Sequence, residues 1–271
     1  MNSIYSYWNF DPGIMSFLAG ISFGYLFIIG FRFRKQSLYF FAGILLIFLC
    51  EASPLHFLGE NYLFSAHMLV HVLILLVAAP LLVAGIPAEN RLKRRFLNLS
   101  ATLFKYPYLA WLIGVGIMWF WHIPYVFNQL FSMQPMGEAH SMSGFMYVHL
   151  LSLLIAGVIF CWPIINPYQE FRMAAPKGVL YLSSACVFCT ILGLMITFSS
   201  VGLYSHYING MDSYGYLSTI RNGWKITPEV DQQMAGLIMW VPCCILYLSA
   251  SMLLLINWFN AGSRREVGMR Y

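Results

Sequence analysis

Seven apolar stretches of about 20 residues constrain the fold of this 271-residue chain more than any other feature. Apolar residues make up 60% of the sequence and charged residues only 9%, whereas about a quarter of a soluble domain is charged. A water-soluble globule is therefore excluded. We predict an all-α integral membrane protein in which residues 1–271 form a single domain with seven transmembrane helices. The expected spans are 13–31, 38–58, 63–84, 107–125, 145–165, 179–203 and 235–259.

The distribution of basic residues predicts the orientation of these helices. Thirteen of the 15 Lys and Arg residues fall after odd-numbered spans, in the loops following spans one, three and five and in the tail after span seven. Lys and Arg accumulate in cytoplasmic loops of membrane proteins. The N-terminus is therefore expected outside and the C-terminus in the cytoplasm. The longest inner loop, 85–106, is basic and is expected to lie on the anionic leaflet, so that membrane lipids are one of its partners.

The histidines all fall on the outer side of this topology, which is the main functional signal in the sequence. His67 and His71 are four residues apart in the third span, so both imidazoles lie on the same face of a helix. Two imidazoles so placed can bind one metal ion, and polar side chains at membrane depth usually face a bundle interior or a wet cavity. The alternative is that both histidines hydrogen-bond to backbone or tyrosine groups between helices.

Further candidate ligands lie at the same depth in other spans. His122 closes the fourth span and His149 lies one turn into the fifth, while Asp231 precedes the seventh and is expected to cap it, or to orient a histidine. Met68 is next to His67, and thioethers favour Cu(I), although methionine is also ordinary packing material. The expected metal is copper, as Cu(I). Other methionines on this side are Met133, Met136, Met142, Met146 and Met234.

Two other groups of polar or reactive residues fall inside the spans. Glu51 is the one acid well within a predicted span, so it needs a partner, is protonated, or lines a polar passage. The cysteine pairs Cys186/Cys189 and Cys243/Cys244 lie in the sixth and seventh spans. A thiolate pair there could hold Cu(I), but small apolar packing residues are the simpler interpretation.

Several function classes lack the residues that they need. No lysine lies within a predicted span, which excludes a retinal Schiff base. The chain has no phosphate-binding glycine loop, no His-Glu-x-x-His motif and no nucleophile elbow, so it is not expected to be an enzyme of those types. The net charge of +5 is small and dispersed, which argues against nucleic-acid binding. A b-type haem or quinone protein remains an alternative, with His67 or His71 facing His149 as axial ligands.

The motifs that carry these residues resemble the membrane-integral CtaG family of cytochrome c oxidase assembly factors. The resemblance covers most of the chain. Its carriers are HMLVH at 67–71, APLL at 79–82, GIP at 85–87, WHIP at 121–124, His149 with WPI at 162–164, and DQQMAGLIMWVP at 231–242.

This resemblance implies a non-enzymatic protein of the bacterial cell membrane that assists assembly of a haem-copper oxidase. The expected role is copper delivery to the CuB centre of the catalytic subunit, with a copper donor chaperone as a further partner. The residues carried over are His67, His71, His122, His149 and Asp231. Two other functions are kept open: a membrane electron carrier with haem or quinone, and an assembly scaffold that binds the oxidase without metal.

Overall fold

The computed structural model describes residues 4–132, 144–209, 212 and 214–268. Helix accounts for 81% of the structure, and the described residues contain no strand. The predicted all-α class is therefore confirmed.

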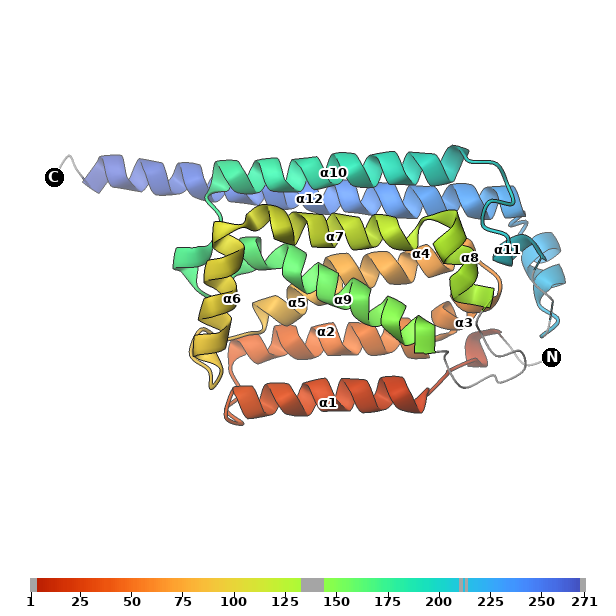
Figure 1. Ribbon diagram of the computed structural model, residues 1–271, viewed down its shortest axis with the longest axis horizontal. Coiled ribbons are helices and arrows are strands. Elements are labelled where there is room, and N and C mark those ends of the chain that lie inside the picture. Colours follow the sequence, from red (N-terminus) through yellow and green to blue (C-terminus); the bar gives the residue numbers. More distant parts are fainter. Residues whose placement is uncertain (1–3, 133–143, 210–211, 213, 269–271) are drawn as a thin grey trace.

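Seven apolar helical segments run side by side as an elongated bundle (Figure 1). Each of them overlaps one of the seven predicted spans, with different ends. Five are long and apolar enough to cross a membrane, and a sixth is added if α6 and α7 count as one bent span; α1 is a shorter apolar helix of 17 residues. The segments are α1 (Pro12–Ile28), α2 (Lys35–Ala52), α4–η2–α5 (Phe64–Ala84), α7 (Pro107–Trp121), α9 (Gly144–Ile165), α10 (Ala175–Phe198) and α12 (Pro228–Gly268).

The second predicted span is shorter than expected because a proline interrupts it. The predicted span 38–58 is divided, because α2 ends at Ala52 and a separate helix, α3 (Pro54–Asn61), follows it. Ser53 adopts an extended backbone, as residues before proline prefer, and its hydroxyl accepts a hydrogen bond from the Leu55 backbone N–H. The outer end of this segment is therefore a short, separately oriented helix.

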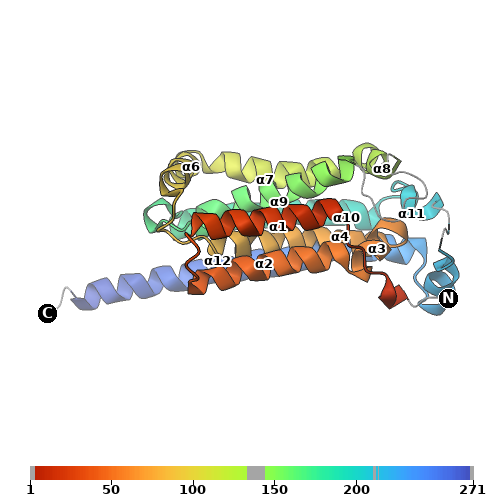
Figure 2. The same ribbon diagram turned by 90° about the horizontal axis from the view of Figure 1, so that it is seen from below.

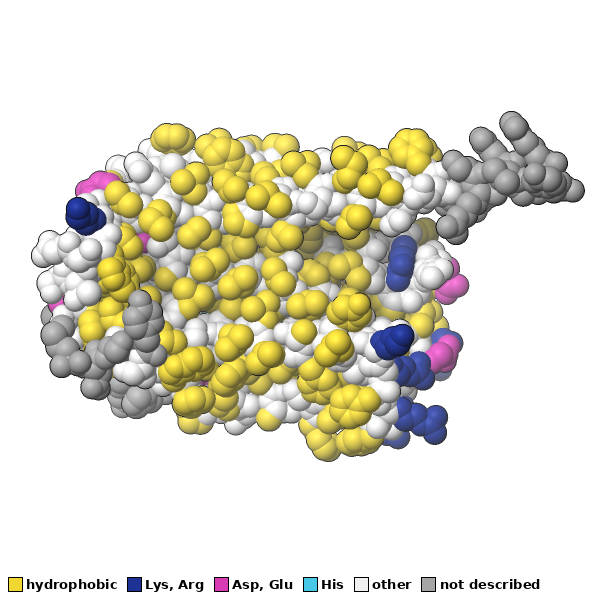
Figure 3. Space-filling view, turned by 180° about the vertical axis from the view of Figure 1, so that it is seen from behind, with side chains coloured by type: hydrophobic (Ala, Val, Ile, Leu, Met, Phe, Trp, Pro, Cys, Tyr) yellow, Lys and Arg dark blue, Asp and Glu magenta, His cyan; other side chains and the backbone are white. Residues whose placement is uncertain are grey.

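A helix also occupies the basic inner loop. α6 (Lys93–Lys105) is bent by 89° from α7, so it lies across the end of the bundle rather than along it (Figures 1 and 2). Basic side chains gather at this end of a broad apolar belt (Figure 3). The expected loop is thus a helix in the position of a membrane-surface segment.

The remaining connections contain short helical elements. The opposite end of the bundle, near the N-terminus, carries α3, α8 and α11 (Figure 1). The seventh helix begins earlier than predicted, at Pro228 rather than at 235. The short elements not yet given are η1 (Ile4–Ser6), α8 (Pro124–Ser132), η3 (Gln169–Phe171), α11 (His206–Asn209) and η4 (Thr219–Gly223).

The third segment contains a π-helical turn just after His71. η2 (Ile74–Ala78) joins α4 (Phe64–Leu73) to α5 (Ala79–Ala84), and the Ala79 backbone N–H donates to the carbonyl of Ile74. Pro80 has no backbone N–H and its ring conflicts with the preceding turn of an α-helix. A wider turn accommodates this proline without breaking the segment.

α10 and α12 pack along each other over most of their lengths (Figure 1). Small residues bring the two backbones close together. A Cβ atom added at Gly236 would lie 2.6 Å from the carbonyl oxygen of Gly193 and would collide with Thr197. Such small-residue contacts replace the hydrophobic effect as the source of helix association within a membrane.

The Gly236→Ala variant should therefore unfold more easily. We expect a loss of about 1–3 kcal/mol, typical of overpacking, because the added methyl must push the two helices apart. The measurement is the unfolding midpoint of the detergent-solubilised protein, followed by circular dichroism. Gly116→Ala on α7 is the matched control, since nothing lies within 4 Å of its added Cβ. Equal stability of both variants would contradict close packing at Gly236.

Candidate metal site

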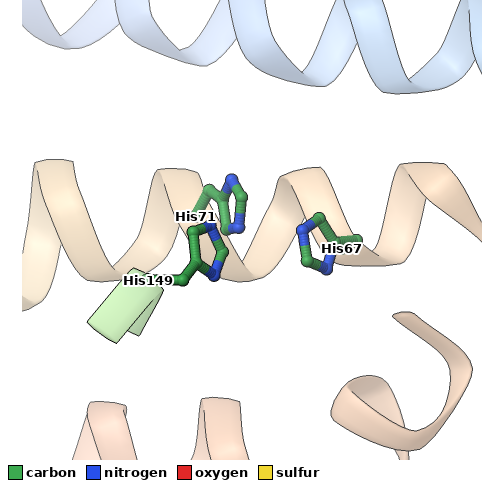
Figure 4. A group of neighbouring side chains, drawn as sticks. All are labelled: His67, His71 and His149. Carbon is green, nitrogen blue, oxygen red and sulfur yellow. The ribbon is translucent and has the colours of Figure 1, made fainter. Parts of the chain in front are cut away.

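Three of the predicted histidines meet inside the bundle. His67 and His71 lie one turn apart on α4, and His149 reaches them from α9 (Figure 4). The ring centroids are 4.2 Å apart for His67–His71, 4.6 Å for His71–His149 and 5.6 Å for His67–His149. One potential ligand atom from each residue lies within 4.8 Å of the others. Residues distant in the sequence therefore form a three-imidazole cluster.

The imidazoles of this cluster are buried, and several of their nitrogens have no hydrogen-bond partner. Among the described residues, no partner is found for Nε2 of His67, for either nitrogen of His71, or for Nε2 of His149. Buried polar atoms are nearly always paired, and an unpaired one costs about 1–3 kcal/mol. The alternative of histidines bonded to backbone or tyrosine groups does not account for these atoms. Unpaired nitrogens that converge are the pattern expected of a ligand-binding site.

His122 and Met68 extend the cluster on one side. The His122 ring lies 5.6 Å from that of His71, and its Nε2 is 3.1 Å from the Sδ atom of Met68. Its Nδ1 contacts the backbone carbonyl of Met118 in the last turn of α7. Pro124 ends that helix, which leaves His122 as its C-terminal cap residue. The structure thus brings His122 and Met68 beside the three-imidazole cluster.

The hydrogen bonds of Asp231 go to the start of α4 and not to the imidazoles. The prediction that Asp231 caps the seventh helix is therefore wrong. Asp231 lies inside α12, which begins at Pro228. Its carboxylate accepts hydrogen bonds from the backbone N–H groups of Phe64 at 2.7 Å and Ser65 at 3.0 Å, and from the Ser65 hydroxyl at 2.6 Å. The N-cap residue of α4 is Leu63, which has no side-chain acceptor. Asp231 therefore caps α4 from another helix, one turn before His67.

Loss of this cap should destabilise the start of α4. In Asp231→Ala, the buried N–H groups of Phe64 and Ser65 lose their acceptor, at a cost of roughly 1–3 kcal/mol. Hydrogen exchange of the α4 amides should rise, as read by mass spectrometry on the detergent-solubilised protein. Glu229→Ala, which removes an exposed acid two residues away, is the control. Unchanged exchange in α4 would show that Asp231 does not hold this helix.

A second polar cluster, formed by Glu51, His56 and Glu60, lies next to the histidines. His56 is placed between the two carboxylates: Nδ1 is 3.4 Å from Oε2 of Glu51, and Nε2 is 3.1 Å from Oε1 of Glu60. Burial alone would lower the pKa of His56, but Glu60 and Glu51 outweigh it and raise the pKa to about 9. The intramembrane Glu51 therefore has a direct partner, the imidazole of His56.

One cavity joins this acidic cluster to the three imidazoles. Its wall includes Glu51, His56 and Glu60 as well as His67, His71 and His149. Gly59 lets α3 approach α4 closely, since a Cβ there would lie 2.9 Å from the His67 backbone nitrogen. The sequence reasoning missed Glu60. The available signal was the i, i+4 spacing of His56 and Glu60 after a helix-starting proline.

Sulfur atoms are found both near the cavity and away from it. Met146 lines the cavity, whereas the Met234 side chain is 39% exposed, away from the site. The cysteines form a separate group between α10 and α12, where Cys186 Sγ donates to Cys244 Sγ at 2.8 Å. Cys189 Sγ lies 3.7 Å from Met118 Sδ. Met133, Met136 and Met142 are outside the described residues.

The cluster has the dimensions of a site for one metal ion. With metal–nitrogen bonds of about 2.0 Å, three ligand atoms around an ion lie roughly 3.5 Å apart. The ligand atoms of His67, His71 and His149 all lie within 4.8 Å of one another, so small side-chain rotations suffice. Three neutral imidazoles suit copper, zinc, iron or nickel, and the nearby thioether of Met68 favours Cu(I).

Together, the apolar helical bundle and the buried imidazole cluster define a helical membrane protein with a candidate transition-metal site. Comparison with known proteins then identifies the family. The model for the cytochrome c oxidase caa3 assembly factor family (Caa3_CtaG) matches residues 31–261. This chain belongs to that family, as its motifs predicted. Neither the curated proteins nor the solved structures give a match.

Proposed function

We propose that this protein binds a copper ion through His67, His71 and His149 and passes it to the CuB centre of a haem-copper oxidase. The observation that supports this most directly is the convergence of buried imidazole nitrogens without hydrogen-bond partners. Family membership provides the context of oxidase assembly and favours a non-catalytic role. Copper is then cargo rather than a resident cofactor.

The position of His122 and Met68 suits a site that must release its ion. Met68 is fully buried, and its sulfur contacts His122 rather than the three-imidazole cluster itself. These two side chains therefore offer additional soft ligands beside the main site. A cation leaving His71 can acquire His122 or Met68 before losing its last imidazole. Ligand exchange one step at a time avoids a free ion in an apolar interior.

The membrane arrangement is part of the same proposal. All seven apolar segments would cross the bacterial cell membrane, with the N-terminus outside and the C-terminus in the cytoplasm. The short α1 and the bent α6–α7 pair are accommodated if α6 lies on the inner surface. The site would then open on the outer side. Its partners there would be the oxidase catalytic subunit and a copper donor chaperone.

The His67→Ala/His71→Ala variant tests the site. Removing two of three clustered ligands should lower the Cu(I) affinity more than the roughly 10- to 100-fold that loss of an outer partner costs. The measurement is competition of the purified protein with a coloured Cu(I) chelator. His206→Gln, which alters a histidine outside the cavity wall, is the control and should keep wild-type affinity. Undiminished Cu(I) binding in the double variant would refute the site.

Two further measurements, one on the purified protein and one on cells, distinguish copper delivery from the other functions. A Soret band in the absorption spectrum of the purified protein would indicate haem rather than copper. Normal copper content of the oxidase in a cell carrying only His67→Ala would support a metal-free scaffold. Reduced oxidase copper with normal levels of the oxidase subunit would support delivery.

Met68→Leu tests the preference for Cu(I). Leucine keeps the volume of the fully buried Met68 but removes its sulfur, so the fold should be retained. We expect weaker Cu(I) affinity with little change in Zn²⁺ affinity, because thioethers bind Cu(I) selectively. Met239→Leu, a buried methionine on α12, is the control. If both metals weaken equally, Met68 acts through packing rather than as a ligand.

A further inference from the structure

We propose that Glu60 and Glu51, held in place by His56, form the entry route along which a copper cation reaches the three-histidine site. This inference rests on the proposed copper-binding function and extends it to the path of uptake. It assigns a role to three residues that the binding site itself does not use.

The exposure of the cavity wall identifies the entrance. Glu60 is partly exposed, whereas every other residue that lines the cavity is buried. An ion entering along this wall therefore meets Glu60 first. The three histidines lie at the buried part of the same cavity, with unpaired nitrogens. The cavity thus connects a partly exposed carboxylate to the candidate ligands.

The arrangement of the acidic cluster gives the route its direction. Glu60 is on α3, and its carboxylate contacts His56 one turn earlier. The other nitrogen of His56 faces Glu51, the fully enclosed carboxylate at the end of α2. His56 therefore fixes both carboxylates at the cavity wall. A copper ion binds carboxylate oxygens more weakly than it binds imidazole nitrogens. An ion at the carboxylates therefore moves onward to the histidines.

Charge favours a cation on this path. The cluster combines two carboxylates with one imidazole, and Asp11, another buried acid, contributes to the same local field. Acidic groups in a cleft with low-dielectric walls concentrate cations and raise association rates by about 10- to 1,000-fold. Near a cation in the histidine site, a buried carboxylate also offsets charge that would otherwise be costly.

A purely structural role of the acidic cluster predicts a different result from a role in ion entry. If the cluster only ties α2 to α3, loss of a carboxylate weakens the fold and leaves the rate of ion uptake unchanged. If it is an entry route, the rate changes while the final ligands stay intact. For an entrance residue that does not bind the ion in its final position, uptake and release slow by the same factor.

The test is stopped-flow transfer of Cu(I) from a coloured chelator to the full-length protein in detergent. For Glu60→Gln we expect uptake and release each to slow by at least about tenfold, with the equilibrium affinity retained. Glu60→Asp, which keeps the charge, should restore most of the rate. Rising salt should slow the wild type and have little effect on Glu60→Gln. Glu229→Gln, an exposed acid outside the cavity wall, should behave as the wild type.

Two results would overturn the inference. One is a wild-type uptake rate in Glu60→Gln that has kept its helical content by circular dichroism. The other is a slow rate in Glu60→Asp equal to that of Glu60→Gln, since the effect would then not follow charge. Either result would contradict the entry route without contradicting the proposed three-histidine copper site. Absence of Cu(I) binding to the wild type, or binding that survives His67→Ala/His71→Ala, would instead refute the proposed function.

Discussion

The burial of imidazoles governs this structure, because several of their nitrogens have no hydrogen-bond partner among the described residues. In an apolar bundle, water cannot compensate an unpaired polar atom, so each such nitrogen must be held in place by the surrounding packing. Capping of α4 by Asp231 supplies part of that support, because it fixes the helix one turn before His67. Close approach of α3 at Gly59 to the His67 backbone supplies another part. The site is therefore a consequence of how α4 is held by its neighbours.

Helix interruptions place the polar groups at useful positions. Pro54 separates α3 from α2, which lets His56 and Glu60 turn toward the cavity instead of continuing along a span. Pro124 ends α7 at the point where His122 meets Met68. Pro80 is accommodated by a π-turn immediately beyond His71. Pro54 and Pro124 each lie two positions from a histidine of these clusters, and the π-turn begins three positions after His71.

The two polar clusters have different chemical characters, which suits movement of an ion between them. Carboxylate oxygens flank His56, and that of Glu60 belongs to a partly exposed residue, whereas the other cluster offers imidazoles and a thioether. A soft cation gains affinity as it moves from the first set to the second. Under the proposed function, such a gradient would allow a metal that is accepted from one protein to be released to another.

The sequence was sufficient to predict an all-α membrane protein, most of its apolar helical segments and its family, because hydropathy and motifs are local properties of the chain. It also singled out His67 and His71, since a four-residue spacing fixes a shared helix face. Only the tertiary structure decided that His149 joins them and that Asp231 caps α4 rather than α12. It alone placed Glu60 in the same cavity. These relations depend on which helices pack together and at what rotation, and spacing along one helix carries no information about the facing surface of another.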